Sequence, residues 1–180
     1  MSWLQQYQAL ARYNRWMNER LFGALAEFDD EERKRDRGAF FGSIHRTLNH
    51  ILLADRIWLA RVTDDRAHFT SRDARGEAIV ITALGQELYA DFQDLTRERA
   101  QTDADTLAYV NQLDEPALAA PFTYQAIDGA TFTNPRWWAL TQLFNHQTHH
   151  RGQVTTLMMQ AGVDPGVTDF MAFMRSEATG

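Results

Sequence analysis

The sequence predicts an all-α protein, a four-helix bundle with a long connection between its third and fourth helices. Three observations carry this prediction. Apolar residues recur at spacings of three and four over several long stretches, which is the period of an amphipathic helix. The chain has 180 residues, about the length of one domain, and 44% of them are hydrophobic. It shows no internal repeat and no low-complexity linker, so residues 1–180 are expected to form a single domain.

The first three predicted helices are defined by their apolar stripes. The first covers residues 2–27, and the second follows Gly42-Ser43 and reaches about residue 62. The third is predicted from about residue 74 to 100. Its spine consists of Ile81, Leu84, Leu88, Phe92 and Leu95.

The fourth predicted helix has clear start and stop signals. Asn134-Pro135 combines a capping residue with proline at the first helical position. The helix continues to Gln160, and Gly162 is a typical residue for its C-terminal end.

The sequence of the long connection before the fourth helix predicts a short helix and a β-hairpin. Residues 106–113 predict a short helix. Alternating residues over 122–127 and 130–133 flank Asp128-Gly129, a pair typical of hairpin turns, so we expect a small β-hairpin. After the fourth helix, the apolar tail that begins at Asp169 predicts one more short helix packed on the bundle.

Composition and charge exclude several classes of function. The net charge is −6 and Lys34 is the one lysine, so neither a nucleic acid nor an anionic membrane surface is an expected partner. The absence of cysteine leaves His, Asp and Glu as the metal ligands. No apolar run approaches the eighteen or more residues of a membrane span, and the first residues lack the organisation of a signal peptide. We therefore expect a cytoplasmic protein.

Two histidines of the fourth predicted helix have a spacing that suits a metal ion. His146 and His150 are four residues apart, so both imidazoles lie on one face. At about 100° per residue, His150 falls within the apolar face and His146 at its border, whereas His149 lies outside it. Imidazoles that enter an apolar interior need partners, and a metal ion supplies one. Taken alone, a pair at this spacing more often consists of ordinary surface or core residues.

Two familiar metal-site patterns are disfavoured. Zincins also place histidines four apart, but the residue after the first is the glutamate that acts as general base, and here it is Gln147. Di-iron bundles need Glu three residues before a histidine on two helices, and no histidine here has one.

The second predicted helix offers further polar candidates. His45 and His50 flank its apolar face on opposite sides, and helix phase does not choose between them. Asp55 lies near the centre of that face. It could be buried in an ion pair with an arginine such as Arg151 or Arg12, or it could act as a hydrogen-bond acceptor or proton-transfer group near a metal. The structural role is favoured.

Three segments together resemble a known family. Residues 145–153, Asn-His-Gln-Thr-His-His-Arg-Gly-Gln, are similar to the most characteristic motif of the DinB/YfiT-like family of bacterial proteins. This family is unrelated to the DNA polymerase that shares the name. Residues 47–58 resemble the family's second helix, and residues 13–18 resemble a segment near its start. The resemblance covers nearly the whole chain in order and spacing.

The resemblance implies an up-down-down-up four-helix bundle with a metal held by three histidines. Carried over by position, these are His50, His146 and His150, which selects His50 over His45. The family's metal is usually nickel or zinc, and homodimers are common, so a divalent metal and a homodimer are expected here.

The better understood relatives of this family depend on low-molecular-weight thiols. They include mycothiol-dependent maleylpyruvate isomerase and bacillithiol S-transferases. The resemblance therefore implies a metal-dependent enzyme that activates such a thiol for transfer to an electrophilic small molecule. Two alternatives stay open: a metal-dependent hydrolase, with Asp55 as the candidate base, and a non-catalytic metal- or ligand-binding stress protein.

Two further groups of residues are candidates for roles beside such a site. A thiol that carries carboxylates would be held by a cation, and the candidates are Arg151, Arg12 and Arg15. Aromatic residues that could line a substrate pocket are Trp137, Trp138, Phe40 and Phe41. Core packing or a two-fold interface is the favoured role for these four.

Overall fold

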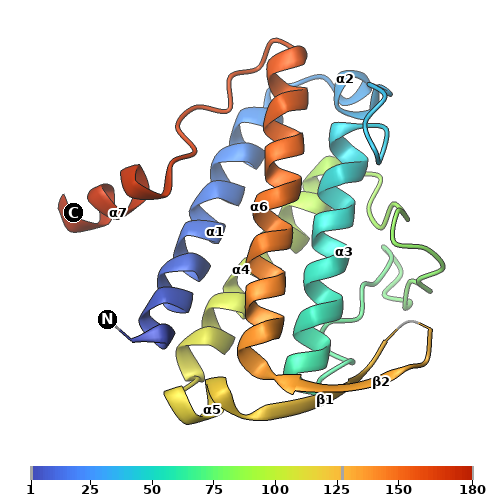
Figure 1. Cartoon of the computed structure of the whole chain (residues 1–180). Coiled ribbons are helices and arrows are strands. Elements are labelled where there is room, and N and C mark those ends of the chain that lie inside the picture. The colour runs from blue at the N-terminus through green and yellow to red at the C-terminus, as the bar shows by residue number, and fades with distance from the viewer. Residues whose placement is uncertain (1, 127, 180) are drawn as a thin grey trace.

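Four long helices dominate the structure, and each packs against two of the others. They are α1 (Trp3–Ala26), α3 (Ile44–Thr63), α4 (Phe92–Gln112) and α6 (Arg136–Gln160). Helices α1 and α3 each contact both α4 and α6. In Figure 1 the chain runs upward in α1 and α6 and downward in α3 and α4. This computed structural model describes residues 2–126 and 128–179.

The ends of the long helices follow from local hydrogen bonding. Ser2 and Gln5 form a capping box that starts α1, with the Ser2 hydroxyl accepting from the Gln5 N–H at 3.2 Å. Helix α6 ends at Gln160, as predicted, and Gly162 just beyond it has a φ of +81°. The Val163 N–H donates to the Met158 carbonyl at 2.9 Å, which closes a Schellman motif. Glycine suits this position because a side chain is strained at positive φ.

The chain before α4 differs from the prediction of a helix that begins near residue 74. Residues 64–91 form an irregular connection, which Figure 1 shows returning beside α3 to the start of α4. Gly76 has a φ of +82°, and the β-branched run Ile79-Val80-Ile81-Thr82 lowers helix propensity. The apolar spacing there reflects packing of the connection on the helices, with Leu88 buried in the main core.

The region between α4 and α6 confirms the hairpin and corrects its surroundings. The predicted short helix over 106–113 is the end of α4, and α5 (Glu115–Ala119) follows it. Strands β1 (Pro121–Gln125) and β2 (Thr131–Pro135) then pair antiparallel. Ile127, in the first predicted strand, lies outside the described residues. Asn134 does not cap α6 as expected, because it pairs with Phe122 inside the sheet.

Two further short helices, besides α5, lie outside the four long ones. Helix α2 (Asp30–Lys34) was not predicted, and α7 (Phe170–Thr179) corresponds to the predicted tail helix. Figure 1 shows α7 beside α1, where Phe173 is buried against Trp16 with 5.5 Å between ring centroids. Within the described ranges, no helix is both long enough and apolar enough to cross a membrane.

Candidate metal centre

Three imidazoles from two helices converge at one point. His50 lies on α3, and His146 and His150 lie on successive turns of α6, which packs directly against α3. One ring nitrogen from each lies within 4.8 Å of the others, and the Nε2 atoms of His50 and His146 are 3.0 Å apart. In the part of the chain that the structure describes, this is the one group of three or more His or carboxylate side chains with such spacing.

Hydrogen bonds on the outer side of two rings orient their inner nitrogens. His50 Nδ1 lies 2.8 Å from the Leu84 carbonyl oxygen, and His150 Nδ1 lies 2.8 Å from Gln153 Oε1. A carbonyl or amide oxygen only accepts, so the ring proton of each histidine is on Nδ1. Both Nε2 lone pairs are then free to face the cluster, which is the arrangement that second-layer hydrogen bonds give to metal-binding histidines.

His146 has the least satisfied ring of the three. Its Nδ1 is buried without a hydrogen-bond partner, and its Nε2 faces the lone pair of His50 Nε2. Whichever nitrogen carries the proton, one nitrogen of this ring is left unpaired among protein atoms. A cation at the meeting point of the Nε2 atoms would satisfy the inner lone pairs together.

The electrostatics of the cluster keep all three rings neutral near neutral pH. Burial, together with the smaller effect of the neighbouring imidazoles His150 and His50, lowers the pKa of His146 to about 4. Burial also lowers the pKa of His50 and of His150. Neutral imidazole is the form that binds metals. The donor set therefore fits a divalent metal of the nitrogen-preferring kind, such as zinc or nickel.

Phe41 covers one side of the cluster. Its ring stacks on His50 with 4.0 Å between centroids and an interplanar angle of 23°, and it lies 5.6 Å from the ring of His150. Gly85 lies directly beside the Phe41 ring. The neighbouring Phe40 points away and is 86% exposed. Of this aromatic pair, Phe41 borders the site.

The remaining histidines do not join this group. His45 is fully buried, and its Nε2 lies 2.8 Å from the Tyr89 carbonyl oxygen, so it is a hydrogen-bonded core residue. His149 is exposed, and its ring lies against that of His150 with 4.7 Å between centroids. His68 lies 3.1 Å from the carboxylate of Asp105. The ring nitrogens that converge are thus those of the three histidines that the family resemblance selects.

Asp55 belongs to a second polar cluster, a buried ring that links the four long helices. Going round, the ring consists of Asp55, Arg99, Asp103, Asn14, Arg151 and Gln147. Asp55 Oδ2 accepts from Arg99 at 2.6 Å and also from the Gln147 amide. All six side chains are buried. The ring therefore joins α3 to α4, α4 to α1, α1 to α6, and α6 back to α3.

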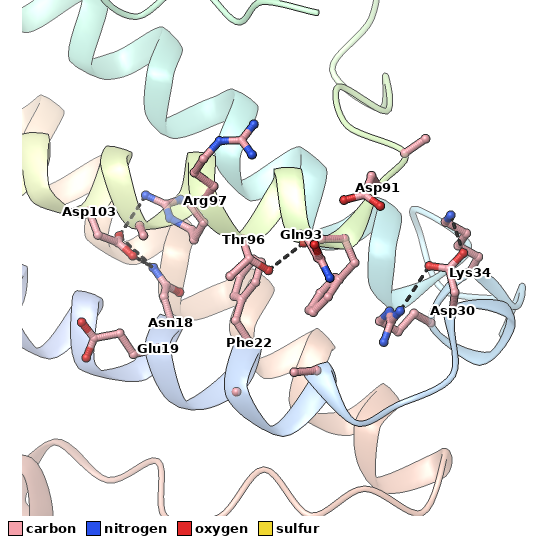
Figure 2. A pocket seen from close by; sticks show the side chains of 17 residues that line it. Asn18, Glu19, Phe22, Asp30, Lys34, Asp91, Gln93, Thr96, Arg97 and Asp103 are labelled. Atoms are coloured by element: carbon pink, nitrogen blue, oxygen red, sulfur yellow. Dashed lines mark hydrogen bonds and ion pairs between the residues drawn. The ribbon is translucent and has the colours of Figure 1, made fainter. Parts of the chain in front are cut away.

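The α1–α4 side of this ring borders a groove between these two helices. Figure 2 shows Asn18 and Asp103 pointing toward one another across α1 and α4, and the Asn18 amide donates to Asp103 at 2.9 Å. Arg99 Nη2 lies 2.9 Å from Oδ1 of that carboxylate, the same oxygen that accepts from Asn18 at 2.9 Å. Burial raises the pKa of Asp103 to about 6, against the lowering effect of Arg99.

The arginines and tryptophans proposed from sequence lie away from the imidazoles. Asp55 pairs with Arg99, not with Arg151 or Arg12, because Arg99 reaches it from the adjacent α4. Arg151 joins the ring through Gln147 and Asn14. The other candidates have these positions: Arg12 pairs with Glu177, Arg15 with Glu19, Trp137 packs on Trp3, and Trp138 is exposed near the start of α6.

Sequence reasoning missed the ring, although it left a signal. Asn14 and Asn18 are four apart on α1, and Arg99 and Asp103 are four apart on α4. Polar pairs at this spacing inside apolar stripes face the same interior and must find partners there.

Comparisons with known proteins agree with the resemblance noted in the sequence. A family model described as the DinB family matches residues 1–180. Protein DinB of Bacillus subtilis is 25% identical over 169 residues, which make up 92% of this chain and 91% of that protein. The crystal structure of a DinB-like protein from Bacillus cereus has a TM-score of 0.59 and 20% sequence identity, covering 84% of this chain and 91% of the other. At that identity the structural likeness shows the fold alone.

Proposed function

Because this chain belongs to the DinB family, we propose that it is a metal-dependent enzyme that transfers a low-molecular-weight thiol to an electrophilic small molecule. The observation that carries the proposal is the convergence of His50, His146 and His150 within 4.8 Å of one another. Three protein donors leave coordination positions free, which is typical of a catalytic metal site and not of a structural one.

The three histidines are the proposed ligands of a divalent ion, nickel or zinc. Such an ion lowers the pKa of a thiol that binds to it, so the thiol becomes a nucleophile at neutral pH. The protein's own part is to hold the ligands in place. Leu84 and Gln153 fix two of the rings through Nδ1, and Phe41 shields one side of the cluster from water.

A hydrolase on the same site would need a general base close to the metal. Asp55, the candidate for that role, is 1% exposed and is already engaged by Arg99 and Gln147. This placement favours the thiol-transfer reaction over hydrolysis. We assign Asp55 a positioning role, since it holds Gln147 between the two histidines of α6.

We extend the proposal to the wider properties of the protein. The contacts and directions of the long helices in Figure 1 support the up-down-down-up four-helix bundle that the family resemblance implies. Exposed aromatic side chains such as Trp138 and Phe40 favour association of two copies, because a two-fold interface would cover them. The cytoplasm is the proposed compartment.

The metal assignment is tested by loading each variant with zinc or nickel, chelating mildly and measuring bound metal by elemental analysis. Replacing His50, His146 or His150 with alanine should weaken metal binding more than about 100-fold. The matched control is His149→Ala, which removes an exposed histidine from the same helix and should keep the metal. Stoichiometric metal in the His150→Ala variant would contradict the assignment.

The reaction is tested with a panel of thiols. The metal-loaded protein receives glutathione, bacillithiol, mycothiol or cysteine together with a generic electrophile, and conjugate formation is compared with protein-free and His146→Ala reactions. We expect faster conjugation with one of these thiols and the loss of that enhancement in the variant. Equal rates with every thiol, with and without protein, would reject the thiol-transfer function and leave the metal site itself standing.

A further inference from the structure

A large groove lies beside α3, next to the histidine cluster but separate from it. Its volume is roughly 910 Å³, and it runs between α3, the irregular connection and the tip of the β-hairpin. Leu84 is shared by the two places: it lines the groove, and its carbonyl oxygen accepts from His50. This volume lies in the range of pockets that hold small organic ligands.

Part of the lining of the groove is apolar. The half-buried Ile57 of α3 lines it together with side chains of the connection, among them Ile79, Ile81 and Leu84. Ile81 is 40% exposed and Leu84 is 47% exposed. Exposed large apolar side chains that line a concave surface favour an apolar occupant, because its binding removes them from water.

Another part of the lining carries excess positive charge. Arg61 and Arg66 both line it, and neither forms an ion pair with a carboxylate among the described residues. The Arg61 guanidinium lies over Trp58 and Tyr124, at 4.8 and 5.0 Å from the ring centroids. Burial lowers the pKa of Arg61, and the charge of Arg66 lowers it further. Two neighbouring guanidinium groups of this kind would be stabilised by an anion between them.

Two other charged side chains line the groove. Arg56 donates to the Glu98 carboxylate at 2.6 Å and also to the hydroxyl groups of Ser71 and Tyr89. Asp128 at the hairpin tip accepts from the Ala130 N–H at 3.0 Å and forms no ion pair among the described residues. The groove therefore has two unpaired arginines against one unpaired carboxylate, and this positive excess contrasts with the net charge of −6 for the whole chain.

We propose that this groove binds a small amphiphilic anion, a hydrocarbon or aryl group that ends in a carboxylate. The apolar part lies against Ile57 and Ile81, and the carboxylate lies at Arg61 and Arg66. No metal ligand takes part in this binding, so the site does not depend on the thiol-transfer function proposed above.

A second groove, between α1 and α4, does not share these features. Its volume is roughly 740 Å³, and Figure 2 shows it lined by charged residues. Asp30 pairs there with Lys34 at 2.6 Å and with Arg33 at 3.3 Å, and Asp103 is held within the buried ring. Acids and bases are balanced in this groove, so it gives no comparable preference for an anion.

The test uses three ligands with the same eight-carbon chain: octanoate, octanol and octylammonium. Each is titrated calorimetrically into the metal-free and the metal-loaded protein. Octanoate should saturate one site in both forms and bind at least about tenfold more tightly than octanol. Octylammonium should show no saturable binding. Octanol binding as tightly as octanoate would overturn the role of the arginines.

Variants test the position of the ligand. Arg61→Gln should weaken octanoate binding about tenfold or more, and the exposed Arg66→Gln should weaken it several-fold. Ile81→Gln should weaken the binding of octanoate and of octanol alike, since it changes the apolar lining and leaves both arginines in place. The matched control is Arg20→Gln, because Arg20 also lies over a tryptophan, Trp16, at 4.9 Å but is remote from the groove.

Three outcomes would overturn the proposal. The first is the absence of saturable octanoate binding up to millimolar concentration. The second is equal affinity in wild type, Arg61→Gln and Arg66→Gln. The third is a change in the oligomeric state of Arg61→Gln without ligand, which would show that a second copy of the chain occupies the groove. A negative thiol assay, in contrast, leaves the octanoate result unaffected.

Discussion

One nine-residue stretch of α6 contributes to two polar clusters that differ in how fully their atoms are paired. Gln147 and Arg151 close the buried ring, in which two aspartates meet two arginines and the amides bridge the gaps. His146 and His150, on the neighbouring face, meet His50 with three neutral rings and no opposing charge. The ring matches its charges within the protein, although Arg99 Nε and Nη2 are buried without a hydrogen bond, whereas the histidine cluster presents lone pairs that converge on one another.

This difference indicates that residues of one sequence motif have two roles: Gln147 and Arg151 stabilise the fold, whereas His146 and His150 are suited to bind a ligand. A buried polar group is stable when its hydrogen bonds and charges are matched inside the protein. The ring matches its charges through side chains of all four long helices, so its role is to hold their relative positions. The histidine cluster does not meet that condition without a cation. The following predictions test this contrast, beginning with the largest effect.

Breaking the ring should cost the most stability. Arg99→Met leaves Asp55 and Asp103 buried without their shared cation, so the free energy of unfolding should fall by about 3–5 kcal/mol. Urea denaturation measures this change. The matched control is Arg97→Met, two residues earlier on α4, where the arginine is exposed and the stability should hardly change. An equal effect of both substitutions would contradict a structural role for the ring.

Gln147→Glu should also destabilise the protein. The change places a second carboxylate against Asp55 inside the core, and the free energy of unfolding should fall by about 2–3 kcal/mol at pH 8. The loss should be smaller at pH 5, because burial favours the protonated form of the new carboxyl group. Gln142→Glu, exposed on the same helix, serves as the control. A stable Gln147→Glu protein that hydrolyses esters would instead place this residue at the metal.

The histidine cluster should control the pH dependence of the metal-free protein. The pKa of His146 is lowered to about 4 in the folded state, from an ordinary value of 6.5. The unfolded chain therefore binds the proton more tightly, and the free energy of unfolding should rise as pH rises from about 4 to about 6.5. Discounted for partial exposure of the ring, the rise is on the order of 1–2 kcal/mol.

Urea denaturation at a series of pH values measures this rise, and His146→Gln should flatten it. Asp103 acts in the opposite direction, since its folded pKa is raised to about 6 and its ionisation destabilises the fold as pH rises. Asp103→Asn should therefore make the rise steeper. A slope that His146→Gln leaves unchanged would argue against the neutral, buried state of this ring.

Removing the aromatic cover should have the smallest effect on stability. Phe41→Ala deletes the ring stacked on His50 and should cost about 1 kcal/mol. It should also speed the modification of His50 by diethyl pyrocarbonate, followed by peptide mass spectrometry. Phe40→Ala is the control. Because that ring is 86% exposed, its removal should change neither the stability nor the modification rate of His50. Equal modification rates in the two variants would show that Phe41 does not shield the cluster.

Three of the four long helices and the hairpin could be predicted because local signals define them. Amphipathic stripes, the Ser43 cap and the Asp128-Gly129 turn all act over a few residues. The third long helix was predicted at about 74–100 but lies at 92–112, because the apolar residues of the connection over 64–91 also recur at helical spacing. That connection is held by contacts with α3, as when the N–H of Leu88 donates to Asn49 Oδ1 at 2.9 Å. Such tertiary contacts leave no mark in a short window of sequence.

In the candidate site, too, local signals could be predicted from the sequence and tertiary contacts could not. Helix phase placed His146 and His150 toward the interior, but it could not decide between His45 and His50, which flank one stripe of α3. The structure separates the two by their neighbours, a backbone carbonyl for His45 and two imidazoles for His50. Asp55 was recognised as buried, yet its partner Arg99 lies 44 residues away, beyond any local pattern.

The hydrogen bond from His50 to Leu84 ties a proposed metal ligand to the irregular connection between α3 and α4. Segments with few backbone hydrogen bonds open by local unfolding at small cost, and their amide protons exchange quickly with solvent. A ligand that binds only the closed state shifts this opening equilibrium by mass action. If His50 binds a metal, metal occupancy and hydrogen-exchange protection of residues 79–85 should rise together, and this irregular stretch would act as the protein's sensor of metal.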